Sequence, residues 1–244
     1  MMEYIKRIFL LFVITLFFNS HLIAQKYERL NGAWNAAFID QEINDKVDFR
    51  VELHFRTIDF VSVWDQKIFR PQLIFKASKN VQWFAGYSYL RNFNADVMAD
   101  PRVRTEHNLW EQVLYKTPLN KGFFATWIRL EHRLQEALPL QKEKALKSFD
   151  FSSRIRFRVI YDRPLTTTEV KLPTSFVFYN EVFLLMNPNG IPNQFNQNWT
   201  FLGIKLDLNK KITLNTGFQK NTISKSSGNF LINRLWNTTL FYKL

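Results

Sequence analysis

The sequence predicts an all-β fold, an antiparallel transmembrane β-barrel of about 10 to 12 strands that follows a cleaved signal peptide. Three observations lead to this prediction. The chain opens with a short charged segment and a short apolar run. Its remainder alternates between apolar and polar residues with a period of two, and the alternating segments are longer than the strands of most globular sheets.

Residues 1–24 have the order of charged, apolar and small residues that is typical of a secretory signal peptide. Two basic residues precede a run over residues 8–18 that is apolar except for Thr15. A helix that spans a membrane needs about 20 apolar residues, so this run is too short to be a permanent anchor. We expect cleavage after Ala24. Residues 25–244 are then a single outer-membrane barrel domain, because no linker rich in Pro, Gly or Ser divides them.

The strand pattern is clearest at residues 47–56. Apolar residues alternate there with charged residues and histidine, which places the two sets on opposite faces of a strand. A helix would scatter both sets around its circumference. Similar segments follow, and most match the roughly 9 to 11 residues that cross a bilayer at a tilt. The further strands are predicted over residues 33–38, 69–77, 81–89, 104–115, 123–134, 151–161, 175–185, 198–208, 212–222 and 230–244.

The number of strands raises a difficulty. The segments amount to eleven, whereas a barrel with both chain ends in the periplasm needs an even number. Either residues 26–31 contain a further strand, which gives about twelve, or residues 33–38 lie outside the closed wall, which leaves about ten. We favour twelve.

The connections between these segments alternate in length. Outer-membrane barrels place tight turns on the periplasmic side and long loops outside, and the alternation follows this rule. Residues 163–173 are the exception, because they form a long link on the periplasmic side. The short connections are residues 78–80, 118–122 and 209–210, and the longer ones are residues 92–103, 135–148 and 187–196.

Residues 151–161 indicate which face meets lipid. Arg154, Arg156 and Arg158 alternate there with apolar residues. An arginine that faces lipid at mid-depth costs about 2 to 4 kcal/mol, so the three arginines are expected to point into the lumen. In a soluble periplasmic binding barrel, which we keep as an alternative, the apolar residues would point inward instead.

A high aromatic content favours the membrane. Aromatic residues make up 16% of the chain and include 25 Phe. Trp and Tyr suit the headgroup region of a bilayer, because one end of the side chain is apolar and the other forms hydrogen bonds. The residues that recur in the predicted strands are Trp83, Tyr87, Tyr89, Trp110, Tyr115, Trp127, Trp199, Trp236 and Tyr242.

The inward-facing charges predict an ion-paired ladder. Like charges that face each other across two strands repel, so carboxylates are needed among the arginines. We favour a ladder that fills a narrow lumen, because small barrels have interiors occupied by side chains. The alternative is a constriction that attracts anions. The ladder is expected to contain Arg129, Glu131, Arg133, Arg154, Arg156, Arg158 and Glu181.

Motifs for catalysis, cofactors or metals are weak. The chain has no cysteine and only seven glycines, so neither a thiolate site nor a glycine-rich phosphate loop is expected. Its histidines follow no helical metal-binding spacing. We therefore expect no enzyme, no cofactor and no metal site. The alternative is an outer-membrane lipid-modifying hydrolase with a Ser-His-acid set on the strands, which would use His54, or His107 with Glu106.

The net charge of +12 points to anionic partners. The leader holds two of the 33 Lys and Arg and one of the 21 Asp and Glu, so the remaining chain keeps a charge of +11. The basic residues are dispersed at alternate positions, which favours lumen and loop positions over nucleic-acid binding. Expected partners are outer-membrane lipid, lipopolysaccharide and a small solute. The terminal strand with Leu240, Tyr242 and Leu244 on one face also resembles the segment that barrel-assembly machinery recognises.

Several motifs occur together in this chain. They are Trp34, Glu106 to Gln112, Trp127 to Arg133, Arg154 to Arg158, Asn180 to Phe183 and Phe195 to Asn198. In this combination the chain resembles a Bacteroidetes-type family of exported proteins, classed as a domain of unknown function and expected to form outer-membrane barrels. The resemblance implies fold and location and supplies no reaction. We therefore expect a structural or interaction protein, or a narrow solute passage, in the bacterial outer membrane.

Overall fold

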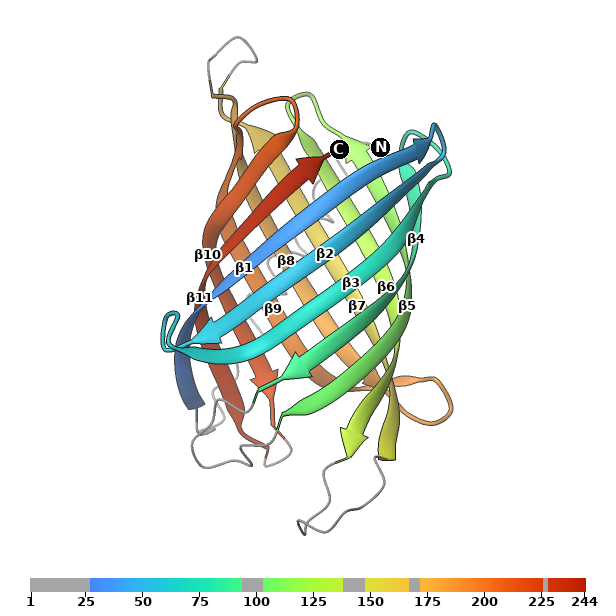
Figure 1. Ribbon diagram of the computed structural model, residues 1–244, viewed down its shortest axis with the longest axis vertical. Helices are drawn as coiled ribbons and strands as arrows, with labels where there is room; N and C mark the ends of the chain where they lie inside the picture. The colour runs from blue at the N-terminus through green and yellow to red at the C-terminus, as the bar shows by residue number, and fades with distance from the viewer. Residues whose placement is uncertain (1–26, 94–102, 138–147, 167–171, 226–227) are drawn as a thin grey trace, which may run out of the picture.

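The structure, a computed structural model, describes residues 27–93, 103–137, 148–166, 172–225 and 228–244. Within these residues eleven strands close one barrel, which Figure 1 shows from the side. No described helix is long and apolar enough to span a membrane. The expected signal peptide lies outside the described residues. The strands are β1 (Tyr27–Asn44), β2 (Val47–Ile58), β3 (Val63–Lys76), β4 (Val81–Asn92), β5 (Arg104–Pro118), β6 (Phe123–Ala137), β7 (Ser148–Pro164), β8 (Thr174–Met186), β9 (Pro192–Asp207), β10 (Ile212–Ser224) and β11 (Phe230–Lys243).

Every segment expected from the alternating pattern is a strand, and the strands have between 12 and 18 residues. Several of them begin or end at proline. Pro118 and Pro164 close β5 and β7, and Pro192 opens β9. Proline has no backbone N–H to donate, so it disturbs the hydrogen-bonded ladder least at these positions.

The closure of the barrel differs from the expectation. Consecutive strands are antiparallel, but β1 and β11 are parallel, in a register that runs from Tyr27 opposite Phe230 to Asp40 opposite Lys243. A parallel pair allows an odd number of strands to close. The predictions of ten and of twelve strands are therefore wrong, because both assumed that the first and last strands are antiparallel.

The extent of β1 also shows whether the segment before residue 33 forms a separate strand. Residues 27–31 are the first part of β1, which runs without a break to Asn44, so they do not form a separate strand. Because β1 is parallel to β11, its first residue lies at the end of the barrel opposite to the one where β11 finishes (Figure 1).

The two ends of the barrel differ in their connections. We name the end that carries the C-terminus the short-turn end, and the opposite end the long-loop end. The link between β7 and β8 is long and lies at the short-turn end, as expected; its residues 167–171 are not described. The short-turn end has the connections 45–46, 77–80, 119–122, 165–173 and 208–211, and the long-loop end has 59–62, 93–103, 138–147, 187–191 and 225–229.

The two faces of the wall have opposite polarity. On β2, Phe49 and Phe55 are exposed on the outer wall, whereas Glu52 and Arg56 are buried in the lumen. Among the described residues, buried polar and charged residues outnumber buried apolar ones. This arrangement is the reverse of a water-soluble protein, in which large apolar residues are mostly inside.

Two apolar clusters pack inside the barrel. The first is in the middle of the lumen, and the second lies on β3 to β5 and includes Trp110. The ring of Trp110 lies against β4 because Gly86 has no side chain; a Cβ atom there would be 2.3 Å from the ring. The first cluster is Trp34, Phe183, Trp199 and Leu235, and the second is Ile74, Phe84 and Trp110.

Candidate functional site

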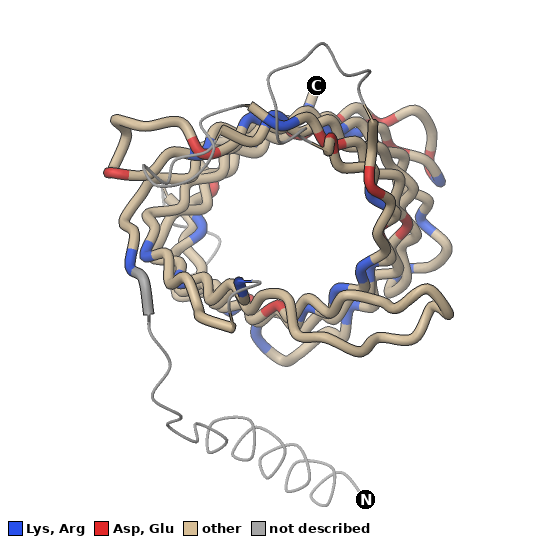
Figure 2. Tube along the Cα trace, turned by 90° about the horizontal axis from the view of Figure 1, so that it is seen from below, with Lys and Arg blue, Asp and Glu red and all other residues tan. Residues whose placement is uncertain are grey.

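A cavity of about 580 Å³ occupies the lumen and is lined by residues of all eleven strands. Viewed from one end, the wall forms a closed ring around it (Figure 2). The cavity extends from Leu30 and Ile223 near the long-loop end to Phe38 and Phe241 toward the short-turn end. Its length and its charged lining make it the candidate functional site.

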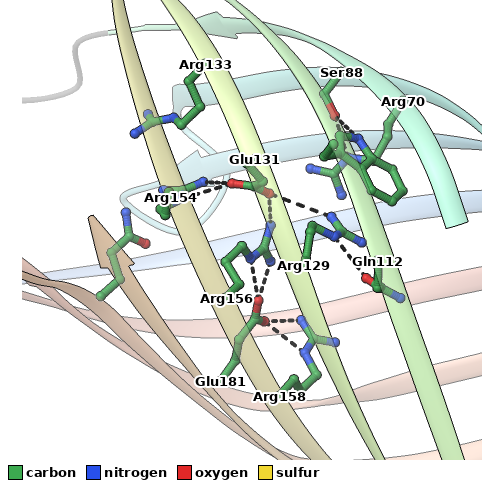
Figure 3. Close-up of polar contacts among 12 residues, drawn as sticks. Arg70, Ser88, Gln112, Arg129, Glu131, Arg133, Arg154, Arg156, Arg158 and Glu181 are labelled. Atoms are coloured by element: carbon green, nitrogen blue, oxygen red, sulfur yellow. Dashed lines mark hydrogen bonds and ion pairs between the residues drawn. The ribbon is translucent and has the colours of Figure 1, made fainter. Parts of the chain in front are cut away.

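Two acidic residues hold arginines together in the middle of the lumen (Figure 3). Glu131 accepts hydrogen bonds from Arg154 Nη2 and Arg156 Nη1, each at 2.5 Å. Glu181 accepts hydrogen bonds from Arg156 and Arg158. The two carboxylates are 1% and 0% exposed. We name this group the central network, consisting of Arg129, Glu131, Arg154, Arg156, Arg158 and Glu181.

The strand register explains why the acids are needed. Arg129 lies directly opposite Arg156 across β6 and β7, and these like charges repel. Glu131, two residues from Arg129 on the same face, bonds to Arg156 and has an oxygen 3.8 Å from Arg129 Nη1. A buried charge costs several kcal/mol when it is left without a partner. The network is therefore a set of mutually dependent charges.

Arg133 does not join this network, although the alternation predicted it in the same ladder. Its Nε and Nη2 donate to the two oxygens of Glu106 at 2.8 and 3.1 Å. Gln135 donates to the same carboxylate. This bidentate contact places Arg133 in a separate ion pair, with Glu106, nearer the long-loop end.

A third charged group lies on β2 and β3. Glu52 accepts hydrogen bonds from Arg70 Nη1 at 2.9 Å and Gln72 Nε2 at 2.6 Å, and contacts His54 Nε2 at 3.0 Å. The ladder expected from the sequence did not include Glu52, Arg70 or Gln72. Their alternation with outward-facing Phe and Leu was the available signal.

Two arginines in the lumen lie close over tryptophan rings. The guanidinium carbon of Arg56 is 4.0 Å from the ring centre of Trp34, and that of Arg129 is 3.9 Å from Trp110. Arg56 Nε and Arg129 Nη1 are buried and have no hydrogen-bond partner among the described residues. Cation–π contacts stabilise a guanidinium without neutralising it. Both side chains therefore leave positive charge in the lumen.

The cavity wall is dominated by positive charge. Eight arginines line it, against three carboxylates. Glu131 and Glu181 are almost fully buried beneath the arginines that they bind. A wall of this kind attracts anions and repels cations. Among the described residues, no three His, Asp or Glu side chains are placed to hold a metal ion.

The aromatic residues divide between the two faces, which corrects part of the sequence reasoning. Trp110 and Trp199 were expected at the membrane surface but are buried in the lumen, where Trp127 also lies, on the same face of β6 as Arg129. Trp83 and Trp236 are about half exposed, at 52% and 53%, on the outer wall. Composition shows only that aromatic residues are abundant, whereas the alternation within each strand sets the face that a ring takes.

The histidines of the described strands have different surroundings, and His54 contacts Glu52 in the lumen. His107 and Glu106 are neighbours in β5 and point to opposite faces, His107 toward Tyr87 and Glu106 into the lumen. His132 Nδ1 lies 3.0 Å from Ser153 Oγ on the outer wall. Within the described part of the chain no acidic side chain is recorded in contact with His132.

Comparisons with known proteins give one match. The model of a family described as a protein of unknown function (DUF2490) matches residues 31–231. No curated protein and no solved structure is recognisably similar to the chain. The match includes β2 to β10 completely, and with them the central network.

Proposed function

The chain belongs to the DUF2490 family of proteins of unknown function, and from its structure we propose that it is an outer-membrane β-barrel of a Gram-negative bacterium. Its lumen, lined by arginine, acts as a narrow passage for small anionic solutes. The observation that carries the proposal is the reversed polarity of the wall.

The outer wall exposes large apolar side chains along its whole height. Leu109, Ile128, Leu202 and Phe157 are between 43% and 65% exposed, whereas Glu181 in the lumen is fully buried. Exposed apolar surface costs about 25 cal/mol per Å² in water, a cost that hydrocarbon removes. Soluble proteins rarely expose continuous apolar patches larger than a few hundred Å². The wall therefore suits a bilayer.

The ends of the outer wall carry the aromatic residues that suit a membrane surface. Trp83 and Tyr115 are exposed near the short-turn end, and Trp64 is exposed near the long-loop end. Rings with one polar and one apolar edge are stable at headgroup level. This spacing supports an apolar band between two aromatic girdles.

The orientation follows from the connections. Outer-membrane barrels keep short turns in the periplasm, which places the long-loop end outside the cell. The start of β1 then lies outside and the end of β11 inside, because the two strands are parallel. An ordinary barrel with an even number of strands would have both ends in the periplasm.

We expect single cysteines to report this orientation, since the chain has none of its own. Arg29→Cys and Asn189→Cys, near the long-loop end, should react with a membrane-impermeant maleimide on intact cells. Lys79→Cys and Lys243→Cys, at the short-turn end, should react only after the outer membrane is permeabilised. Labelling of both Arg29→Cys and Lys243→Cys on intact cells, or of neither, would contradict the parallel closure.

The passage itself is tested in a planar bilayer. With a salt gradient across the membrane, the reversal potential of the purified barrel should indicate a preference for chloride over potassium. Arg129→Gln should reduce this preference, because it removes one of the eight arginine charges that line the cavity. Lys67→Gln on the outer wall is the matched control and should leave the potential unchanged. A cation preference, or the absence of any current, would refute the proposed passage.

A further inference from the structure

The lumen near the long-loop end has an apolar side. Its apolar residues lie in the halves of neighbouring strands nearest the long-loop end, from β10 through β11 and β1 to β4, and Asp65 and Gln66 of β3 line the cavity beside them. Three of them, Leu30, Ile223 and Leu231, are only partly buried although they line the cavity. We name this surface the apolar collar, consisting of Leu30, Ile58, Ile68, Leu90, Ile223 and Leu231.

The opposite side of the lumen at this end is charged. Glu106, Arg133 and Arg154, on β5 to β7, line the same cavity. The entrance from the long-loop end therefore has one apolar and one charged side. A lumen filled by salt bridges would have polar groups around its whole circumference, and a purely apolar pocket would have none. This entrance matches neither case.

Arg56 lies directly below the apolar collar. It is two residues from Ile58 on the same face of β2, a separation of about 7 Å along a strand. Its guanidinium lies over Trp34 and 5.2 Å from the ring centre of Trp199. Its Nη1 donates to the side-chain oxygen of Gln66 at 2.5 Å, and its buried Nε has no partner among the described residues.

From this juxtaposition we propose that the lumen binds an amphiphilic organic anion, a medium-chain carboxylate in its simplest form. The carboxylate contacts Arg56, and the alkyl chain lies on the apolar collar toward the long-loop end. The proposal rests on the function proposed above, because it names the class of anion that the lumen takes.

The chemistry of the two sides selects this ligand over simpler ones. The apolar collar offers no hydrogen-bond donors that could replace the water around a small inorganic anion. Such an anion therefore gains no binding free energy from the collar. A neutral alkyl chain would leave the charge of Arg56 unmatched, and an alkyl cation would meet a wall with eight arginines. Only a molecule with both parts uses both surfaces.

The test uses the full barrel in zwitterionic-lipid nanodiscs, with empty nanodiscs as the blank. Isothermal titration calorimetry should detect saturable binding of octanoate, and binding of acetate or octanol at least about tenfold weaker. Arg56→Gln should weaken octanoate binding about tenfold or more, because it removes a charge-assisted contact. Leu231→Asn should weaken octanoate binding and leave acetate binding unchanged.

Two variants control for damage to the fold. Arg56→Lys retains the charge and should bind octanoate more tightly than Arg56→Gln, while Lys67→Gln on the outer wall should bind as the parent protein does. Equal affinity for acetate, octanol and octanoate would overturn the proposal, as would unaltered binding by Arg56→Gln. A chloride current without octanoate binding would refute this site and retain the passage. Octanoate binding without a current would refute the passage and retain the site.

Discussion

Glu181→Ala is expected to destabilise the barrel by about 3 to 5 kcal/mol, the cost of removing one partner from a buried ion pair. Glu181 is fully buried and binds both Arg156 and Arg158. Its loss leaves Arg158 without a carboxylate and leaves Arg156 with Glu131 alone. The free energy of unfolding in lipid vesicles, measured by tryptophan fluorescence in urea, reports the effect.

A matched control and a double variant separate charge from packing. Glu42→Ala removes an exposed acid near the short-turn end and should change the stability by less than about 0.5 kcal/mol. The pair Glu181→Met and Arg158→Met should cost less than the sum of the single variants, because it removes a charge together with its partner. A barrel that loses less than about 1 kcal/mol on Glu181→Ala would have a hydrated lumen in which the network does little.

Leu202→Arg is expected to cost about 2 to 4 kcal/mol in a bilayer, because it places an arginine at mid-depth on the lipid-facing wall. Leu202 is 51% exposed and lies within β9, distant from both of its ends. Vesicle unfolding gives the free energy, and migration of unboiled samples in a detergent gel gives the folded fraction.

Leu208→Arg makes the same change just beyond the end of β9, where an arginine reaches the headgroups. It should cost only about 0 to 1 kcal/mol. Both leucines are similarly exposed in the protein alone. The difference between the free energy costs of the two substitutions therefore measures burial in lipid. Two equally small effects would favour a soluble barrel and refute the membrane proposal, because surface substitutions in water change stability by about 0.5 kcal/mol or less.

The local pattern was sufficient for the strands and for the central charges. The alternation at residues 47–56 and 151–161 predicted β2 and β7 with their arginines on one face, because a strand turns successive side chains to opposite sides. It also predicted Glu131 and Glu181 among those arginines. The structure brings both acids into contact with them.

That pattern could not predict which side chains of different strands contact each other. Arg133 and Arg129 have the same spacing from Glu131, yet Arg133 pairs with Glu106 on β5. Arg56 was recognised as one polar residue of an alternating run, without its contact to Trp34. Such contacts depend on the register between strands, and a periodicity within one strand contains no information about register.

An all-β chain of long strands, each with one apolar and one charged face, was predictable from the residues alone, because alternation is a local property of the backbone. Only the closed wall shows that β1 pairs with β11 in parallel, that the described strands are odd in number, and that Tyr27 and Lys243 lie at opposite ends of the barrel. The physical reason is that either direction of pairing satisfies the backbone hydrogen bonds of both strands. Their direction is set only when the whole wall closes.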